Sequence, residues 1–331
     1  MRNNICLFQF LIFIQLLFSQ EVKDDGQWHT ISGATVAIAR HECSFVGFDN
    51  MFFLLGGRGI KPVSIYNTET NTWTKGKEPP IEIHHFQAVS YDGNIYVFGA
   101  MSGKFPYEKP LKNILIYKPE EDVWKTGPAI PAARRRGSAG VIVQDDKAYL
   151  ISGIVDGHNS KHVPWVDSYD FKTESWQTLA DAPRPRDHFH AAYYAGKIYA
   201  AGGRNSSYAT GQIFDLTIPE VDVYDMASNT WTTLPLENNI PTMRAGTTAA
   251  FLGKDLLVIG GESMAQNEAH NTVEAYNTET KTWRKLSALN TGRHGSQAVV
   301  HENEIYIAAG CGRRGGKPEL PSMEVFRTIQ N

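Results

Sequence analysis

A module of about fifty residues that recurs six times constrains this chain more than any other feature of its sequence. In each copy an apolar segment and a turn lead to a second segment, rich in aromatic and β-branched residues, that ends in two small residues. Steps of 43 to 58 residues separate these pairs, which are Gly56-Gly57, Gly99-Ala100, Ser152-Gly153, Gly202-Gly203, Gly260-Gly261 and Ala309-Gly310. A chain of 331 residues could hold two ordinary domains, but such a period predicts one repeat structure instead.

Each module continues with a third segment that closes on an aromatic residue. The aromatic residues are Tyr66, Tyr117, Tyr169, Tyr224, Tyr276 and Phe326. A tryptophan follows seven residues later in five modules, at Trp73, Trp124, Trp176, Trp231 and Trp283. Turn-forming residues between the aromatic residue and the tryptophan predict a reversal into a fourth strand. We therefore expect every module to be a four-stranded antiparallel sheet.

The sixth module ends without its tryptophan, because the chain stops at Asn331 soon after Phe326. An N-terminal strand around Trp28 would supply the missing tryptophan and join the last sheet to the first part of the chain. Closure of this kind leaves no free sheet edge. The sequence thus predicts an all-β, six-bladed β-propeller over residues 20–331, with its last blade closed by the N-terminal strand.

These features resemble the kelch repeat family, whose modules share the small-residue pair, the aromatic residue, the tryptophan and an arginine ahead of the first strand. The resemblance covers residues 20–331 and implies the propeller fold, but kelch propellers serve as adaptors, enzymes and surface receptors. The exported sialic acid mutarotases are a kelch group of similar size. Gly261-Glu262 is similar to a Gly-Glu element of that group, although no arginine follows Glu262 closely here.

The first residues predict export. Arg2 precedes an apolar run that ends near Ser19, and a polar segment follows at once, so residues 1–19 are expected to be a signal peptide. The uninterrupted apolar stretches are shorter than the ~20 residues of a membrane span. We expect a secreted or periplasmic protein with no membrane span in the mature chain. Its cysteines, Cys43 and Cys311, form either a disulfide or two buried thiols.

Charge excludes one class of partner. The chain has 32 Lys and Arg against 35 Asp and Glu, a formal net charge of -3, and no polybasic run. Nucleic acid is therefore not an expected partner.

An arginine column marks one face of the expected propeller. Alignment on the small-residue pairs brings together Arg40, Arg136, Arg186, Arg244 and Arg293, with Ile83 in the second module. Each arginine can serve packing and hydrogen bonding between blades. Taken together around a channel mouth, they would create a positive potential suited to carboxylate, sulfate or phosphate groups.

Histidines follow the arginine column closely. The next column holds His41, His84 and His294, and His85, His188 and His190 come just after it. Imidazoles beside arginines can hold a ligand, move protons or bind metal. The candidate catalytic groups are His84, His85, His188, His190 and Glu262. We expect no metal and no other cofactor, because arginine charge opposes a cation.

The loops between second and third strands are longest in the second, third and fourth modules, at 101–112, 154–166 and 204–220. Long loops on one face usually form the recognition surface. They offer Trp165, Arg204 and Tyr208 as ligand-binding residues, and the third loop also carries His158 and His162. Aromatic faces beside polar side chains suit sugar rings.

The expected function is binding of an acidic carbohydrate, or another anionic ligand, at this face of a secreted propeller. One alternative is a carbohydrate-active enzyme such as a mutarotase, epimerase or lyase. A second alternative is a scaffold for a protein partner. The sequence does not decide whether the chain is an enzyme.

Overall fold

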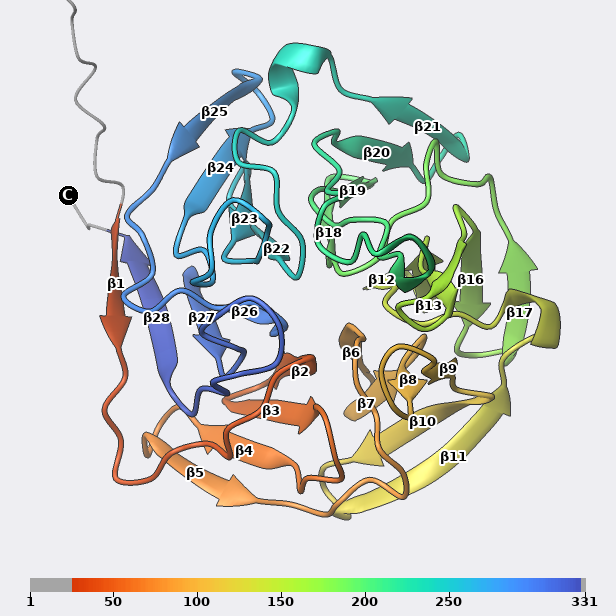
Figure 1. Cartoon of the computed structure of the whole chain (residues 1–331). Coiled ribbons are helices and arrows are strands. Elements are labelled where there is room, and N and C mark those ends of the chain that lie inside the picture. The colour runs from red at the N-terminus through yellow and green to blue at the C-terminus, as the bar shows by residue number, and fades with distance from the viewer. Residues whose placement is uncertain (1–25, 329–331) are drawn as a thin grey trace, which may run out of the picture.

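The computed structural model describes residues 26–328, so the predicted signal peptide lies outside the described residues. Six four-stranded antiparallel sheets stand around a central axis (Figure 1). The fold is the predicted all-β, six-bladed propeller.

Each of the first five blades is built from one module of the repeat. Blade one holds β2 (Cys43–Phe48), β3 (Met51–Gly56), β4 (Ser64–Asn67) and β5 (Thr72–Lys75). Blade two holds β6 (Ala88–Tyr91), β7 (Asn94–Val97), β10 (Asn113–Lys118) and β11 (Val123–Ala129). Blade three holds β12 (Gly140–Gln144), β13 (Lys147–Ile151), β16 (Val166–Asp170) and β17 (Ser175–Thr178). Blade four holds β18 (Ala191–Tyr194), β19 (Lys197–Ala200), β20 (Asp222–Asp225) and β21 (Thr230–Thr233). Blade five holds β22 (Thr248–Leu252), β23 (Asp255–Ile259), β24 (Val273–Asn277) and β25 (Thr282–Lys285).

The sixth blade joins the two ends of the chain. It holds β26 (Ala298–His301), β27 (Glu304–Ala308), β28 (Met323–Thr328) and the N-terminal β1 (Gly26–Thr30). Trp28 lies opposite Phe326, with ring centroids 5.5 Å apart, and takes the place of the absent C-terminal tryptophan. The innermost strand β26 in turn contacts β2 of blade one, which completes the ring.

The seven-residue spacing of tyrosine and tryptophan reflects the turn between the third and fourth strands. Tyr66 pairs directly with Trp73 across β4 and β5, and the ring centroids are 5.1 Å apart. The Tyr66 hydroxyl donates a 2.6 Å hydrogen bond to Asn71, which has a left-handed φ of 55° in the turn. Tyr117 and Tyr224 bond the turn in the same way, so the repeated side chains fix the register of the outer strands.

The apolar core is divided among the interfaces between blades. Six clusters of buried side chains each combine residues of two neighbouring blades. The core therefore lies between the blades, and the innermost strands contribute to it on both sides, as β2 does with Phe45 and Val46.

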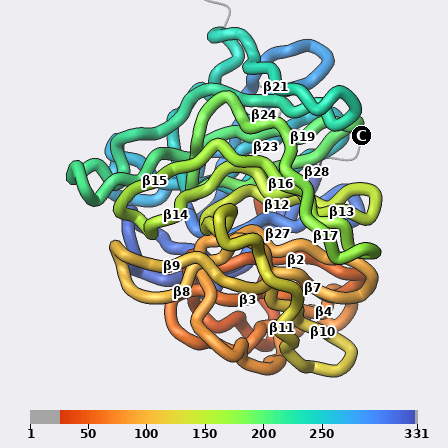
Figure 2. Tube along the Cα trace, turned by 90° about the vertical axis from the view of Figure 1, so that its right-hand side faces the viewer, coloured from red at the N-terminus to blue at the C-terminus, as the bar shows by residue number. Residues whose placement is uncertain are grey.

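Two small hairpins extend from the loops of blades two and three. They are β8 (Met101–Ser102) with β9 (Lys109–Pro110), and β14 (Ile154–Asp156) with β15 (Ser160–His162). Figure 2 shows these hairpins together at one side of the ring, and β9 contacts β14. Short 3-10 turns occupy Ala132–Arg134, Tyr208–Thr210 and Leu236–Asn238. Within residues 26–328, none of the helical segments has the length and apolar character needed to cross a membrane.

Candidate functional site

One residue from each blade contributes to a ring of backbone hydrogen bonds around the axis. We call it the axial ring, and its members are Glu42, His85, Ser138, His188, Gly246 and Gly295. The N–H of His85 donates to the carbonyl of Glu42 at 2.9 Å, and Ser138 donates to His85 at 2.9 Å. The link from His188 to Ser138 uses the serine hydroxyl. The N–H of Gly246 donates to the carbonyl of His188, and the N–H of Gly295 donates to the carbonyl of Gly246. The N–H of Cys43 closes the ring by donating to the carbonyl of Gly295.

All six residues of the axial ring have left-handed backbones, with φ between 54° and 64°. Glycine adopts this conformation freely and occupies it in blades five and six, whereas other residues pay roughly 1 kcal/mol. Strained positions that keep a side chain are concentrated at functional sites. The axial ring therefore points to Glu42, His85, Ser138 and His188 as the side chains around which the site is built.

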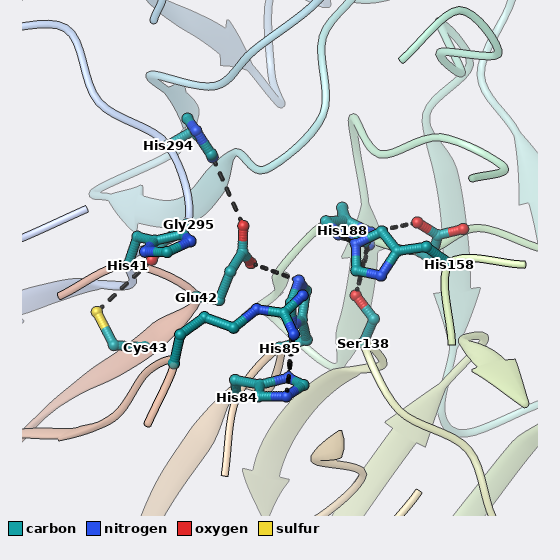
Figure 3. A network of polar contacts seen from close by, with 12 residues as sticks. His41, Glu42, Cys43, His84, His85, Ser138, His158, His188, His294 and Gly295 are labelled. Atoms are coloured by element: carbon teal, nitrogen blue, oxygen red, sulfur yellow. Dashed lines mark hydrogen bonds and ion pairs between the residues drawn. The ribbon is translucent and has the colours of Figure 1, made fainter. Parts of the chain in front are cut away.

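Three histidines gather at the axis, as Figure 3 shows. His85 and His188 come from the axial ring, and His158 comes from the turn between β14 and β15. The centroid of the His85 ring lies 4.8 Å from that of His158 and 4.9 Å from that of His188, and the last two are 4.8 Å apart. All three are buried.

The environment keeps two of these imidazoles neutral. Burial and the neighbouring imidazoles hold the pKa of His85 well below its usual value. Burial and the charge of Arg204 lower the pKa of His188. Burial and the charge of Arg58 also lower the pKa of nearby His84, to about 4.

A second group of charges lies across the axial ring from this cluster. Glu262 is buried and accepts a 2.6 Å hydrogen bond from Arg204 and a 2.8 Å bond from the Gly315 N–H. His294 Nε2 lies 3.4 Å from Glu262. Burial opposes the imidazolium form, but Glu262 outweighs it and, helped by Cys311 and Glu42, raises the pKa of His294 to about 10.

Glu42 stands between the two groups. One carboxylate oxygen lies 3.3 Å from His85 Nε2, and the other lies 3.7 Å from His294 Nδ1 (Figure 3). A neutral imidazole and a charged one therefore face the same carboxylate. This arrangement can accept a proton on one side and donate one on the other.

A cavity of about 610 Å³ opens above the axial ring. Its lining combines charged and imidazole groups with the phenyl rings of Phe105 and Phe214. The titratable lining residues are His41, Glu42, Arg58, Glu82, His85, Lys104, His158, Arg204, Glu262 and His294. A much smaller cavity of about 20 Å³, room for one water, lies on the other side of Glu42 and His85.

The structure places the arginine column inside the blades rather than around the cavity. Arg40, Arg136, Arg186, Arg244 and Arg293 are all buried. Arg136 bonds Asp167 at 2.6 Å, Arg244 bonds Glu274 at 2.6 Å, and each also donates to carbonyls of its own blade. These guanidinium groups are used within the sheets, so they present no ring of free positive charge to a ligand.

The remaining members of the column follow the same pattern. Arg186 pairs with Asp222 and Arg293 with Glu324, while Arg40 bonds Ser64 and blade carbonyls. In blade two, where Ile83 replaces the arginine, Leu115 stands at the position of the acid, and both are buried in one apolar cluster. The acid two residues before the third-strand aromatic in modules three to six, at Asp167, Asp222, Glu274 and Glu324, was the sequence signal that identifies the arginines of those modules as structural.

Other predicted residues are spread over the face. His41 lines the cavity and bonds Glu319 at 2.8 Å. His190 lies in the small cavity, and burial lowers its pKa to about 4. Trp165 packs against the Arg134 guanidinium, 4.7 Å from its ring centroid, away from the cavity lining. Tyr208 is exposed at the mouth and packs on Phe105.

Cys43 and Cys311 are both buried free thiols in the structure. Cys43 Sγ lies 3.6 Å from the Gly295 carbonyl. Burial raises the pKa of this thiol to about 11, so it is a packing group of the axial ring.

Sequence reasoning missed several members of the site. Glu42 was the blade-one member of the column that contains His85 and His188, and Arg58 follows the first small-residue pair as Arg204 follows the fourth. Both positions were therefore visible in the repeat register. Glu108 and Phe105 belong to a loop whose length and sequence differ between modules, so no alignment could place them.

Comparisons with known proteins agree with the fold. A family model described as the KLHDC2/KLHL20/DRC7 Kelch-repeats domain matches residues 128–310, more than half of the chain. The solved structure titled "Structure of YjhT" superposes with a TM-score of 0.74 over 88% of this chain and 95% of its own, at 16% identity. That likeness concerns the fold alone.

Curated relatives share the repeats to different extents. Kelch-like protein terF of Aspergillus terreus is 29% identical over 323 residues, which are 91% of this chain and 68% of that protein. Kelch-like protein 40 of Xenopus laevis is 26% identical over 47% of this chain and 25% of its own length. Alpha-scruin of Limulus polyphemus is 29% identical over 51% of this chain and 19% of its own. The match thus spans about two thirds of the first relative and a quarter or less of the other two.

Proposed function

The chain belongs to the kelch-repeat family, and from that premise we propose that it is an exported propeller whose central cavity binds a small acidic carbohydrate. The observation that carries the proposal is the strained axial ring beneath a polar cavity of about 610 Å³. Four blades keep a side chain where glycine would relieve strain, and three of those side chains, Glu42, His85 and His188, are ionisable.

The cavity lining matches the surface of a sugar. Phe105 and Phe214 provide apolar faces, and the carboxylates of Glu42, Glu82 and Glu262 can accept hydrogen bonds from hydroxyls. Sugar-sized ligands fit sites of this volume and mixed character.

Two cations of the lining support an acidic group on the ligand. Arg204 uses Nε for Ser206 and Nη1 for Glu262, so its Nη2 has no hydrogen-bond partner within residues 26–328. Lys104 is exposed at the rim and has no ion-pair partner in the same part of the chain. A carboxylate held by these two groups would orient the sugar across the axial ring.

A second candidate function, proton transfer on the bound sugar, is favoured by the opposed states of His85 and His294. One imidazole is held neutral and the other charged, on either side of Glu42. Pairs of groups whose pKa values are driven apart are typical of acid and base roles. Mutarotation or epimerisation of the ligand would use such a pair.

A glycan-array screen of residues 20–331, followed by calorimetry on the hits, tests the proposal. We expect binding to acidic glycans that falls at least tenfold in Lys104→Met and Arg204→Met, and is unchanged in Arg327→Met, which removes an exposed cation on β28. Product NMR of each hit then separates a receptor from an enzyme. Absence of any glycan hit, or equal binding by all three variants, would overturn the proposal and direct attention to a protein partner at the exposed aromatic residues of the mouth.

A further inference from the structure

We propose that His85, His158 and His188 bind one divalent ion of the late first transition row, such as Zn²⁺ or Cu²⁺, at the base of the cavity. Each residue can offer one ligand atom, and these atoms lie within 4.8 Å of one another. The nearly equal distances between ring centroids describe a triangle of imidazoles from three different blades (Figure 3). Three histidines with an open position form a familiar donor set for such ions.

Carboxylates orient two of the three rings. His188 Nδ1 contacts Asp187, and His158 Nδ1 lies 3.0 Å from Glu108, both on buried carboxylates. The carboxylate hydrogen-bonded to His188 Nδ1 holds the proton there and leaves Nε2 as a lone pair, and the charge of Glu108 favours the same tautomer of His158. The two Nε2 atoms lie 3.0 Å apart, so a cation between them is needed to offset the repulsion of facing lone pairs.

The third ring is oriented by a histidine relay. His84 Nε2 lies 3.1 Å from the Gly103 carbonyl, an acceptor only, so the proton of His84 resides on Nε2. His84 Nδ1 is then the acceptor for His85 Nδ1, at 2.7 Å. His85 Nε2 is then left as a lone pair although it lies 3.3 Å from a Glu42 carboxylate oxygen, and a cation at this nitrogen would relieve the repulsion between the two. A shared proton could bridge two of these nitrogens, but a metal ion can accept the lone pairs of all three rings.

The local charge balance favours a cation. The acids beside the cluster and its neighbours are Glu42, Glu108, Asp187 and Glu262, against the three cations Arg58, Arg204 and the charged His294. The arginine column, which would have opposed a cation, is used inside the blades.

The open side of the ion would face the cavity. His85 and His158 both belong to the cavity lining, as does Glu42. A water or ligand oxygen on the metal would therefore lie beside a carboxylate able to accept its proton. Sugar binding in the cavity does not require this ion, whereas an ion on His85 would occupy the lone pair that the second candidate function uses for proton transfer.

Metal titration of the chelator-treated chain, residues 20–331, tests the site. We expect Zn²⁺ to bind with one equivalent per chain and micromolar or tighter affinity by calorimetry, and Co²⁺ to produce visible absorption bands of a nitrogen-rich site. Ca²⁺ should not bind, because it prefers six to eight oxygen ligands.

Variants locate the ion. His158→Gln changes a residue of a hairpin turn, and we expect it to weaken Zn²⁺ binding at least a hundredfold, while His301→Gln on β26 leaves binding unchanged. Glu108→Gln should weaken binding by roughly 10- to 100-fold, as loss of an orienting partner does. A chain that binds no Zn²⁺, or a folded His158→Gln that binds it as His301→Gln does, would overturn the proposal.

Discussion

At the scale of single residues, the decisive positions are those where another residue stands although glycine would relieve the strain of a left-handed backbone. The axial ring needs a left-handed backbone in every blade, and only blades five and six use glycine there. Glu42, His85, Ser138 and His188 keep their side chains in spite of this, and two of them meet His158 at the axis. The non-glycine residues of the axial ring therefore mark the site.

His294 gives stability a defined pH dependence. Its pKa is about 10 in the folded chain, above the usual 6.5, because Glu262 outweighs burial. The stabilisation is therefore fully present below about pH 6.5 and is lost as pH rises towards 10. Urea unfolding between pH 6.5 and 10 should show a falling free energy of unfolding, and His294→Gln should reduce that fall. Identical slopes in both proteins would contradict the assignment.

At the scale of the blade, a buried ion pair acts as a latch between the first loop and the third strand. Arg244 and Glu274 are both buried, and the arginine also donates to the Gly260 carbonyl at 2.7 Å. Blade two does without such a pair and uses Ile83 and Leu115 instead. We therefore expect that apolar residues can replace both members of the ion pair together, but that replacing one member alone is destabilising.

Arg244→Met should lower the free energy of unfolding by about 3–5 kcal/mol, because it leaves Glu274 buried without its partner. The double variant Arg244→Met with Glu274→Leu imitates blade two and should recover at least half of that loss. Chemical denaturation of the two variants beside the unaltered chain measures both effects. A double variant no more stable than the single one would show that the latch does more than pair its own charges.

The sequence predicted the blades far better than the site. Tyrosine and tryptophan repeat at a fixed spacing because they meet across two strands, so pattern and contact coincide. The arginine column does not show by itself which way its side chains point. In the structure these side chains turn into their own blades. His158 lies in a hairpin of a loop whose length and sequence differ between modules, so its place beside His85 and His188 follows only from the folded loops.

At the scale of the whole molecule, the ring is closed by the two ends of one chain. Trp28 on β1 is buried against Phe326, and Cys43 bonds the Gly295 carbonyl next to the axis. Closure therefore keeps blade six against blade one, and with it Glu42 against His294. Stability of the ring and geometry of the site depend on the same contacts.

Trp28→Ala should destabilise the propeller by about 3–5 kcal/mol, as expected for loss of a large buried aromatic side chain. Trp73→Ala, which removes a buried tryptophan from a blade built of consecutive strands, is the matched control and should cost a similar amount. Thermal and denaturant unfolding provide the comparison. A loss below about 1 kcal/mol in Trp28→Ala alone would mean that β1 contributes little to closure.

The central claim is that the cavity above the axial ring is where this propeller binds its ligand. Gly316 lines that cavity, and a Cβ placed on it would meet only the end of the His41 ring, at 3.3 Å. The most direct measurement is therefore glycan binding by the plugged variant Gly316→Trp beside the unaltered chain, with melting temperatures checked for both. The account predicts that acidic glycans bind the unaltered chain and that the plug abolishes binding without lowering stability. Binding that persists in a folded Gly316→Trp, or that is absent from both proteins, would contradict it.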